Sequence, residues 1–453
     1  MPIARTHKIG RLLAAALPGF AWLALVGSPT MADTQPTVIH AGTLLAVPGQ
    51  APVRQQTLVI EDGVITSVRD GFVDTAGLGH PDARLIDLSD GFVLPGLMDL
   101  HVHLTTDPGP GSSLRVVTED EADLALIAAR NARRLLEAGF TTVLDLGTGR
   151  RAHEHAIYAL REAIRTGLAP GPRILAAGSP ISMTGGARTG RFADAVEAVV
   201  GPQGVCDGTD DCRRAVREQV KRGADVIVLY NTGSLLAGVP IARTFGDDEL
   251  KAIVETAHAL GRKVIADGQF SEGITAAIRA GVDAVDSALM ADDATIALIR
   301  KSGVYLQSHI HAVAAAVGDT PETLADGIWG WLPRPLLLRL HEIKTREPVI
   351  ARSWRAGVRR LIVASDSGVF PHGQNAREFV HWVRNGIPAS AVLEAATVNP
   401  ARMLGLFDRL GTLEPGKAAD LIAVANSPLD DISELTRVRA VIKGGRLYHR
   451  QRD

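Results

Sequence analysis

The sequence predicts an α/β protein in which a (β/α)8 barrel stands beside a small β-sandwich domain built from both chain ends. Two patterns indicate this fold. Between residues 95 and 406, compact apolar runs alternate with helical stretches rich in alanine, arginine and glutamate, whereas both ends of the chain show short strands with tight turns. The 453 residues are enough for one large α/β domain and a smaller one.

Composition narrows the class of partner. The formal net charge is −2 and aromatic residues make up 4% of the chain, so neither charge nor base stacking favours nucleic acid. The near-neutral charge likewise gives no electrostatic reason to expect binding to an anionic membrane. The sequence gives no signal for an oligomeric state.

Residues 1–32 are predicted to be an export signal. A basic start is followed by an apolar core over residues 12–27, and small residues then allow cleavage after Ala32. A membrane anchor is the alternative, but Pro18 and the short apolar run argue against it. No later run is long and apolar enough to span a bilayer, so we expect a periplasmic or secreted protein.

Two cysteines, Cys206 and Cys212, lie in a loop rich in glycine and aspartate just before a predicted helix. In an oxidising compartment a short-loop disulfide is reasonable, and the chain has no other cysteine. Two free thiols or half of a metal site remain the alternatives.

The predicted β-domain combines residues 37–94 and 407–450. Its strands are short alternating runs bounded by turn residues, and the Glu61–Gly63 stretch is a hairpin signal. The same pattern of short strands and turns occurs again near the C-terminus. These runs cover residues 37–47, 57–68, 83–94, 411–429 and 438–448.

The predicted barrel covers residues 95–406. Eight compact apolar runs, most preceded by glycine, are typical of buried parallel strands. Eight βα units are the count of a TIM barrel, whose active site lies at the carboxyl ends of its strands. The eight runs cover residues 94–104, 138–147, 171–178, 223–233, 261–268, 280–288, 302–308 and 357–368.

Three residues at predicted strand ends suggest a metal site. His101 and His103 are two apart on the first strand, so both side chains share one face. Asp366 ends the eighth strand, which neighbours the first in a closed ring. Two imidazoles and a carboxylate suit Zn²⁺ or a similar ion. The alternatives are a structural histidine pair and an N-cap role for Asp366.

Several stretches of the chain carry a family resemblance: "LPGLMDLHVHL", "GFTTVLDLG", "GPRILAAGSPISMTGG", "GADVIV", "SEGITAAIRAGVDAVDS", "ASDSGVFPHGQN", "EAATVNPARMLGL" and "GTLEPGKAADLIAV". Together they resemble the amidohydrolase superfamily, and most closely its prolidase-like and imidazolonepropionase-related branch. The resemblance implies a metal centre that activates water to attack an amide, lactam or related carbon. It implies metal ligation by His101 and His103, and a double role for Asp366 as ligand and general base.

The rest of the branch pattern does not carry over. Val228 stands where the branch usually has a carboxylated lysine on the fourth strand. Asp267 and Gln269 replace the histidines of the fifth strand, and Ser287 replaces that of the sixth. Ala187 occupies the histidine position of the loop that reads T-G-G-H-G in the family. The resemblance therefore implies a degenerate second metal site.

Three interpretations follow from this pattern. In the first, one ion sits on His101, His103 and Asp366, with Asp267 as a possible fourth ligand; zinc is favoured over iron or manganese. In the second, the barrel binds a small molecule or a protein without metal. In the third, His309 and another histidine two residues later, His311, are relocated ligands unless the strand has already ended before them.

Other polar residues near strand ends are candidates for substrate contact. Tyr230 follows the fourth strand, although it is equally well explained as a packing residue. His372 and Asn375 match the family's loop after the eighth strand, which implies a substrate-facing position, and Asp145 is expected to support the loop after the second strand. The preferred function is metal-dependent hydrolysis of a C–N bond in a small molecule, and the alternative is a binding homologue without catalysis.

Overall fold

The computed structural model describes residues 35–112, 114–148, 151–186, 193, 203–233 and 242–450. The predicted signal at 1–32 and Ala187 lie outside these residues. Within them, no helix has the length and apolar character needed to cross a membrane.

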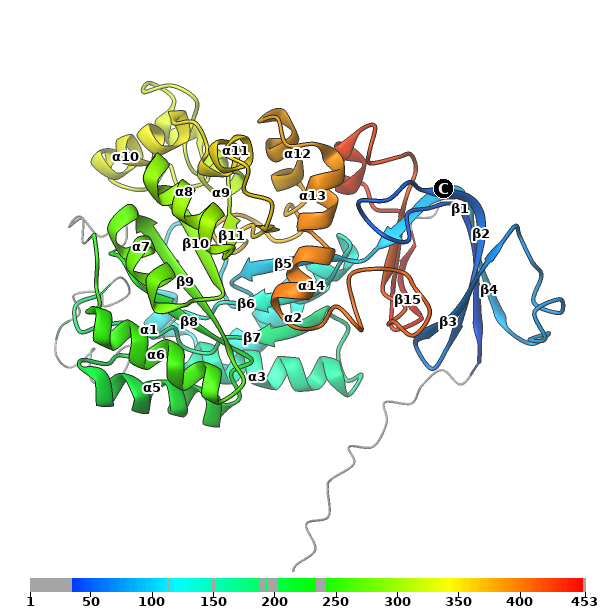
Figure 1. Ribbon diagram of the computed structural model, residues 1–453, viewed down its shortest axis with the longest axis horizontal. Coiled ribbons are helices and arrows are strands. Elements are labelled where there is room, and N and C mark those ends of the chain that lie inside the picture. The colour runs from blue at the N-terminus through cyan, green and yellow to red at the C-terminus, as the bar shows by residue number, and fades with distance from the viewer. Residues whose placement is uncertain are drawn as a thin grey trace, which may run out of the picture.

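Both ends of the described chain contribute to one seven-stranded sheet (Figure 1). Strand β4 joins the two ends, because it pairs in parallel with β1 and antiparallel with β13. The strands of the expected β-sandwich therefore form one continuous sheet. Its order is β15(Arg446–Arg450), β14(Ala440–Lys443), β13(Leu421–Val424), β4(Arg84–Pro95), β1(Thr37–Leu44), β2(Val53–Glu61) and β3(Val64–Asp70).

The eight apolar runs predicted as parallel strands are all strands, divided between two parallel sheets. The three-stranded sheet contains β5(Leu97–Val102), β6(Phe140–Asp145) and β7(Arg173–Ala176). The five-stranded sheet contains β8(Val226–Tyr230), β9(Lys263–Phe270), β10(Ala284–Met290), β11(Tyr305–Ser308) and β12(Leu361–Val363).

The two parallel sheets meet along both edges of the smaller one. At one edge the His103 N–H donates to the carbonyl of Ser367, just beyond β12, at 2.8 Å. At the other, the Ile181 N–H beyond β7 donates to the carbonyl of Val228 on β8 at 2.8 Å. These contacts bring the carboxyl ends of β5 and β12 side by side.

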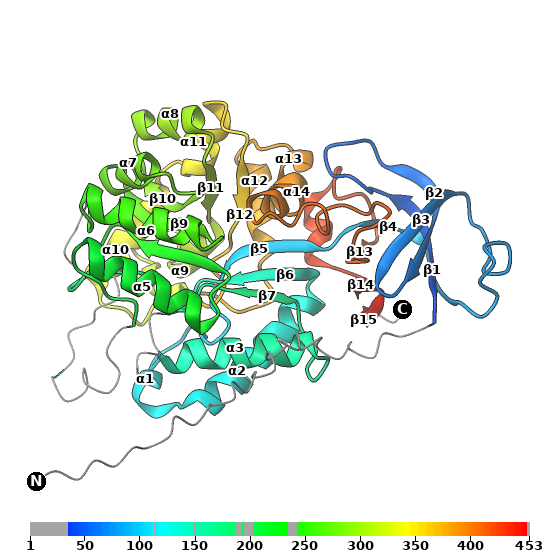
Figure 2. The same cartoon turned by 60° about the horizontal axis from the view of Figure 1, so that its bottom comes forward.

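Helices cover the outer side of the parallel strands (Figures 1 and 2). The sequence sets their limits locally: Asp120 caps the first turn of α2 through a capping box, and Gly281 and Gly303 end α7 and α8 in the left-handed conformation. The described α-helices are α1(Arg115–Thr118), α2(Glu121–Glu137), α3(Arg151–Arg165), α5(Thr209–Arg222), α6(Asp247–Ala259), α7(Ser271–Ala280), α8(Asp293–Ser302), α9(His311–Ala316), α10(Arg334–Thr345), α11(Val349–Arg355), α12(Arg377–Arg384), α13(Ala389–Ala395) and α14(Val398–Met403).

Apolar side chains from all eight parallel strands pack into one interior cluster. Six strands supply its buried members and two supply partly buried neighbours. A larger core fills the space between the strands and the helices. The strand residues of the interior cluster are Leu100, Leu144, Val226, Val228, Ile265, Ala284 and Ile362, with Leu175 and Tyr305 packed against them.

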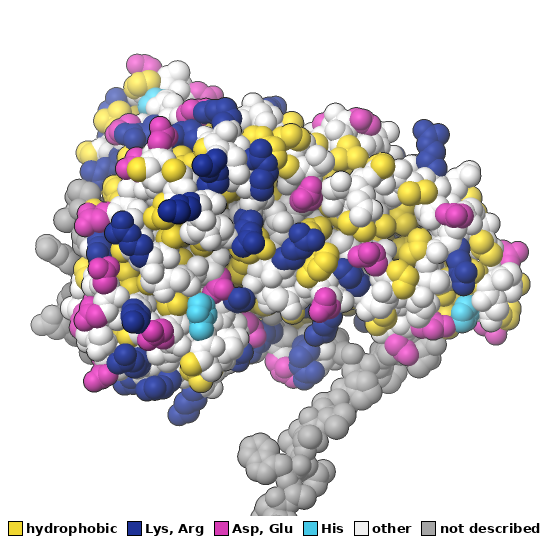
Figure 3. Space-filling model, viewed as in Figure 1, with side chains coloured by type: hydrophobic (Ala, Val, Ile, Leu, Met, Phe, Trp, Pro, Cys, Tyr) yellow, Lys and Arg dark blue, Asp and Glu magenta, His cyan; other side chains and the backbone are white. Residues whose placement is uncertain are grey.

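Two further sequence predictions concern the surface. Cys206 and Cys212 form a disulfide, as predicted, which ties the loop before α5 to the first turn of that helix. On the face drawn in Figure 3, lysine and arginine side chains alternate with aspartate and glutamate over the helical part of the molecule. This mixed surface agrees with the near-neutral charge of the sequence.

Candidate metal centre

The carboxyl ends of β5 and β12 bring together His101, His103 and Asp366. The pairing of β5 with β6 shifts register between Asp99 and Val102, the segment that contains His101. Asp366 follows β12 with a φ of 61°, in the left-handed region. Its N–H donates to the carbonyl of His101 at 2.9 Å, which holds the two segments in register.

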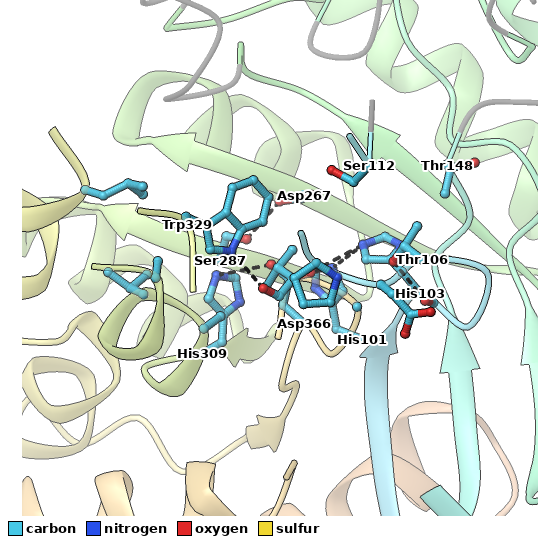
Figure 4. Close-up of a pocket in the computed structure, with 18 of the residues that line it drawn as sticks. His101, His103, Thr106, Ser112, Thr148, Asp267, Ser287, His309, Trp329 and Asp366 are labelled. Atoms are coloured by element: carbon cyan, nitrogen blue, oxygen red, sulfur yellow. Dashed lines mark hydrogen bonds and ion pairs between the residues drawn. The ribbon is translucent and has the colours of Figure 1, made fainter. Parts of the chain in front are cut away.

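The donor atoms of these three residues converge on one point (Figure 4). The Nε2 atoms of His101 and His103 are 3.2 Å apart, and they lie 3.2 and 3.4 Å from Oδ1 of Asp366. Two donor atoms that each lie about 2.0–2.1 Å from one tetrahedral ion are separated by roughly 3.3–3.4 Å. The donor set therefore fits a divalent cation.

A buried carboxylate on β10, Asp286, orients His101. Its Oδ2 atom lies 2.8 Å from Nδ1 of His101 and accepts a hydrogen bond from Nε2 of Gln307 at 3.1 Å. With Nδ1–H donating to Asp286, neutral His101 presents the lone pair of Nε2 to the other two donor atoms. The sequence did not lead us to predict a role for Asp286. The available signal was an acidic residue directly before Ser287, a position predicted to lie at a strand end.

The charges around the cluster favour a cation. Burial disfavours charge on His101, but the carboxylates of Asp286 and Asp366 raise the pKa of His101 well above its usual range. Burial also opposes ionisation of Asp366, yet His101 and His103 hold the pKa of that carboxyl well below its usual range. A site that stabilises positive charge at this point attracts a metal ion for the same Coulombic reason.

A second buried network lies behind the cluster and joins β5 to β12. Asp99 accepts hydrogen bonds from the N–H groups of His101 and Ser365, from the Ser365 hydroxyl and from Nδ2 of Asn375. Asn375, which was expected to face substrate, is fully buried in this network. That expectation is wrong, because the Asn375 amide is needed to satisfy a carboxylate that water does not reach.

The cluster lies in a pocket of about 570 Å³. This volume is within the range of small-molecule sites. The lining includes polar residues at the strand ends and an apolar group between α9 and α10 that includes Trp329 and Trp331. The Trp329 ring is fixed by a hydrogen bond from Nε1 to the carbonyl of Val369 at 2.7 Å.

Comparisons with known proteins agree with this geometry. A family model described as "Amidohydrolase family" matches residues 92–448. The chain belongs to the amidohydrolase family. Ochratoxinase from Aspergillus niger is 28% identical over 442 residues, covering 92% of this chain and 87% of that protein. The solved structure of a Xaa-Pro dipeptidase with bound methionine matches at 31% identity with a TM-score of 0.81, covering 92% of this chain and all of the other.

A deaminase is also among the relatives. The 5-methylthioadenosine/S-adenosylhomocysteine deaminase of Symbiobacterium thermophilum is 25% identical over 425 residues, covering 85% of this chain and 84% of that protein. As a member of this family, the protein is an enzyme that acts on C–N bonds.

The structure shows the surroundings of Val228, Asp267 and Ser287, which the sequence places at expected ligand positions of a second ion. Val228 packs in the apolar interior. Asp267 and Ser287 lie at the pocket floor, where the Ser287 hydroxyl donates to Oδ1 of Asp267 at 2.9 Å. Among the described residues, Asp267 belongs to no group of three potential ligands whose donor atoms lie within 4.8 Å of one another. Asp267, expected as a fourth ligand, is therefore outside the close cluster.

The two histidines after β11 face different ways. The strand ends at Ser308, so both lie beyond it. His309 nevertheless points into the site, with Nε2 at 3.9 Å from Oδ2 of Asp366 (Figure 4). His311 starts α9 and packs instead against Phe370 and His381.

The remaining expected residues are placed as follows. Tyr230 lines the pocket. His372 is buried, is not among the described lining residues, and lies 3.9 Å from Asp107; burial lowers the pKa of His372 to about 4. This placement does not support direct substrate contact by His372. Asp145 accepts hydrogen bonds from the N–H groups of Leu104 and Gly147, and so supports the loops after β5 and β6, as expected.

Replacing Asp286 with asparagine is expected to weaken binding of Zn²⁺ by about 10–100-fold. Asparagine has one acceptor oxygen, whereas both Asp286 oxygens accept hydrogen bonds, so the tautomer of His101 is no longer fixed. Competition with a chromophoric chelator measures the affinity. Asp283→Asn, just before the other end of β10, is the matched control. Wild-type affinity in Asp286→Asn would show that this carboxylate does not orient His101.

Proposed function

We propose that the eight parallel strands close into a (β/α)8 barrel whose mouth carries a hydrolytic site with one divalent ion. Two features support closure: the backbone contacts at both edges of the three-stranded sheet, and the single interior cluster to which all eight strands contribute. On this proposal residues 95–406 form the barrel, and residues 37–94 with 407–450 form the small β-domain.

The proposed reaction is hydrolysis of an amide-like or cyclic-amide C–N bond in a small molecule. His101, His103 and Asp366 would hold the ion, because their donor atoms are separated by 3.2 to 3.4 Å. A divalent ion there supplies Lewis-acid chemistry, which polarises a carbonyl and makes a water more acidic. This convergence of donor atoms is the observation that carries the proposal.

Asp366 is the proposed general base. Its Oδ1 atom faces the two histidines, and Oδ2 is turned toward His309 at the floor of the pocket. We propose that Asp366 takes a proton from the attacking water and delivers it to the leaving nitrogen. The polar and apolar parts of the pocket lining would bind the two parts of the substrate, with Tyr230 as one contact.

The residues at the expected positions of a second set of ligands are consistent with a single ion. The hydrogen bond between Ser287 and Asp267 satisfies two polar groups that would otherwise require a partner, and Val228 offers no donor atom. Zinc is the proposed metal, ahead of iron and manganese, because two imidazoles and a carboxylate with an open position form a catalytic zinc arrangement.

We also propose that the mature protein is periplasmic or secreted. The signal-like residues 1–32 and the Cys206–Cys212 disulfide support an oxidising compartment. Isolation of the native protein with its N-terminus sequenced tests this location.

The metal proposal is tested by elemental mass spectrometry of the mature protein and of a His101→Ala/His103→Ala double variant. We expect about one ion per wild-type chain and none in the double variant. His155→Ala, which removes a surface histidine on α3, is the control and should retain the ion. Two ions per chain would contradict a mononuclear site. No ion after exposure to zinc, manganese and iron would overturn metal-dependent hydrolysis in favour of a barrel that only binds.

A further inference from the structure

His309 is a buried imidazole whose ring makes no hydrogen bond to the described residues around it. His309 is 6% exposed, and its Nδ1 atom is buried without a hydrogen-bond partner in the described part of the chain. Its Nε2 atom faces Asp366 Oδ2 at 3.9 Å, too far for a hydrogen bond. Nε2 is therefore the ring nitrogen that faces the cluster and is available to a ligand there. A buried imidazole without a hydrogen bond is expected to have such a partner.

The ring of His309 belongs to the same constellation as the other two imidazoles. It meets the His101 ring edge-on, with centroids 5.8 Å apart. One of its nitrogens lies within 4.8 Å of donor atoms on His101 and Asp286, although His309 is not part of the close group formed by His101, His103 and Asp366. His101 and His103 approach one oxygen of Asp366 and His309 faces the other, so three imidazoles surround a single carboxylate (Figure 4).

Hydrogen bonds to the side chain of Glu378 fix the loop that carries His309. Both carboxylate oxygens of Glu378 on α12 accept hydrogen bonds from the next two N–H groups of the loop, those of Ile310 and His311, each at 2.7 Å. The Trp382 indole also donates to Glu378 at 2.6 Å. A ring positioned by such a buried support is preorganised for a ligand.

The polar residues nearest to this side of the cluster have other partners. Asp267 is bonded to Ser287, and Asp286 to His101 and Gln307. Of Asp267, Asp286 and His309, only His309 has described contacts that include no hydrogen bond.

We propose that His309 is a third imidazole ligand of the same ion that His101, His103 and Asp366 hold. This inference rests on the proposed metal-dependent function and deepens it. It gives the site three histidines and one aspartate, so the attacking water would take a fifth coordination position. The loop after β11 would supply a ligand in place of β9 and β10. His311, two residues later, takes no part, because its ring packs against Phe370 and His381.

The deciding experiment is X-ray absorption at the zinc edge of wild-type protein loaded with one Zn²⁺ per chain, together with His309→Gln. We expect scattering from three imidazoles in wild type and two in His309→Gln. Zn²⁺ affinity, measured by chelator competition, should fall by more than about 100-fold, beyond the effect typical of an outer-shell change. His311→Gln is the matched control and should retain three imidazoles and wild-type affinity within about twofold.

Two imidazoles in wild-type protein, or equal affinity in His309→Gln, would overturn the inference. If His309→Gln fails to fold, as judged by thermal unfolding, the imidazole count in wild type still decides. Failure of the metal proposal looks different, because the His101→Ala/His103→Ala variant would then keep its ion or wild type would bind none.

Discussion

Asp366→Asn is expected to lower kcat by about 10²–10⁴-fold, the range associated with loss of a general base. Asparagine preserves the size of the side chain and one donor oxygen, but it does not take a proton from water. The measurement uses whichever substrate the wild-type enzyme hydrolyses from a panel of dipeptides, N-acyl amino acids and lactams. Because one oxygen of Asp366 also faces the two histidines, Zn²⁺ content is determined on the same samples.

The control for this prediction is Asp319→Asn. Asp319 is an exposed carboxylate paired with Lys344, and its loss should leave kcat unchanged. If Asp366→Asn, loaded with one ion per chain, retains more than a tenth of wild-type kcat, then another group takes the proton from water and the assigned role of Asp366 is wrong.

Asp99→Ala is expected to lower the free energy of unfolding by about 3–5 kcal/mol, the scale for removing one partner of a buried charged network. Asp99 accepts four hydrogen bonds, and burial raises the pKa of its carboxyl although those donors oppose the shift. Alanine leaves the N–H groups of His101 and Ser365 and the Asn375 amide without an acceptor. Urea unfolding followed by tryptophan fluorescence measures the change.

Asn375→Ala removes one of the four donors and should destabilise the protein less, by about 1–3 kcal/mol. Comparing the two variants separates the effect of losing the carboxylate from the effect of the cavity that any truncation to alanine creates. Equal losses in both variants would indicate that packing, rather than the buried charge, holds β5 against β12.

Local patterns in the sequence were sufficient for much of the fold. Compact apolar runs marked all eight parallel strands, and the short strands at both chain ends marked one shared β-domain, although the sequence predicted a β-sandwich and the strands form a single seven-stranded sheet. The pairing of Cys206 with Cys212 followed from short spacing and the lack of other cysteines. These features depend on residues close together in the chain, so the signal is contained in a short window.

The sequence predicted members of the candidate metal cluster only where a potential ligand stands at or near the end of a predicted strand. His101 and His103 are two residues apart, and Asp366 lies just beyond β12, whose carboxyl end lies beside that of β5. Asp286 was not found because its role depends on a contact with His101 across 185 positions of sequence. Asn375 was misread for the same reason, since its partner Asp99 lies 276 positions earlier.

The sequence by itself determined the order of the strands, the β-domain shared by both chain ends and the three residues whose donor atoms converge, and it favoured the disulfide. Only the tertiary structure decided which second carboxylate orients His101, that Asp267 pairs with Ser287, and that His309 faces the site while His311 faces away. The physical reason is the same in each case. Periodicity fixes which residues share a strand face, but beyond the last residue of a strand the direction of a side chain depends on contacts with distant elements, here Glu378 on α12 and Asp286 on β10.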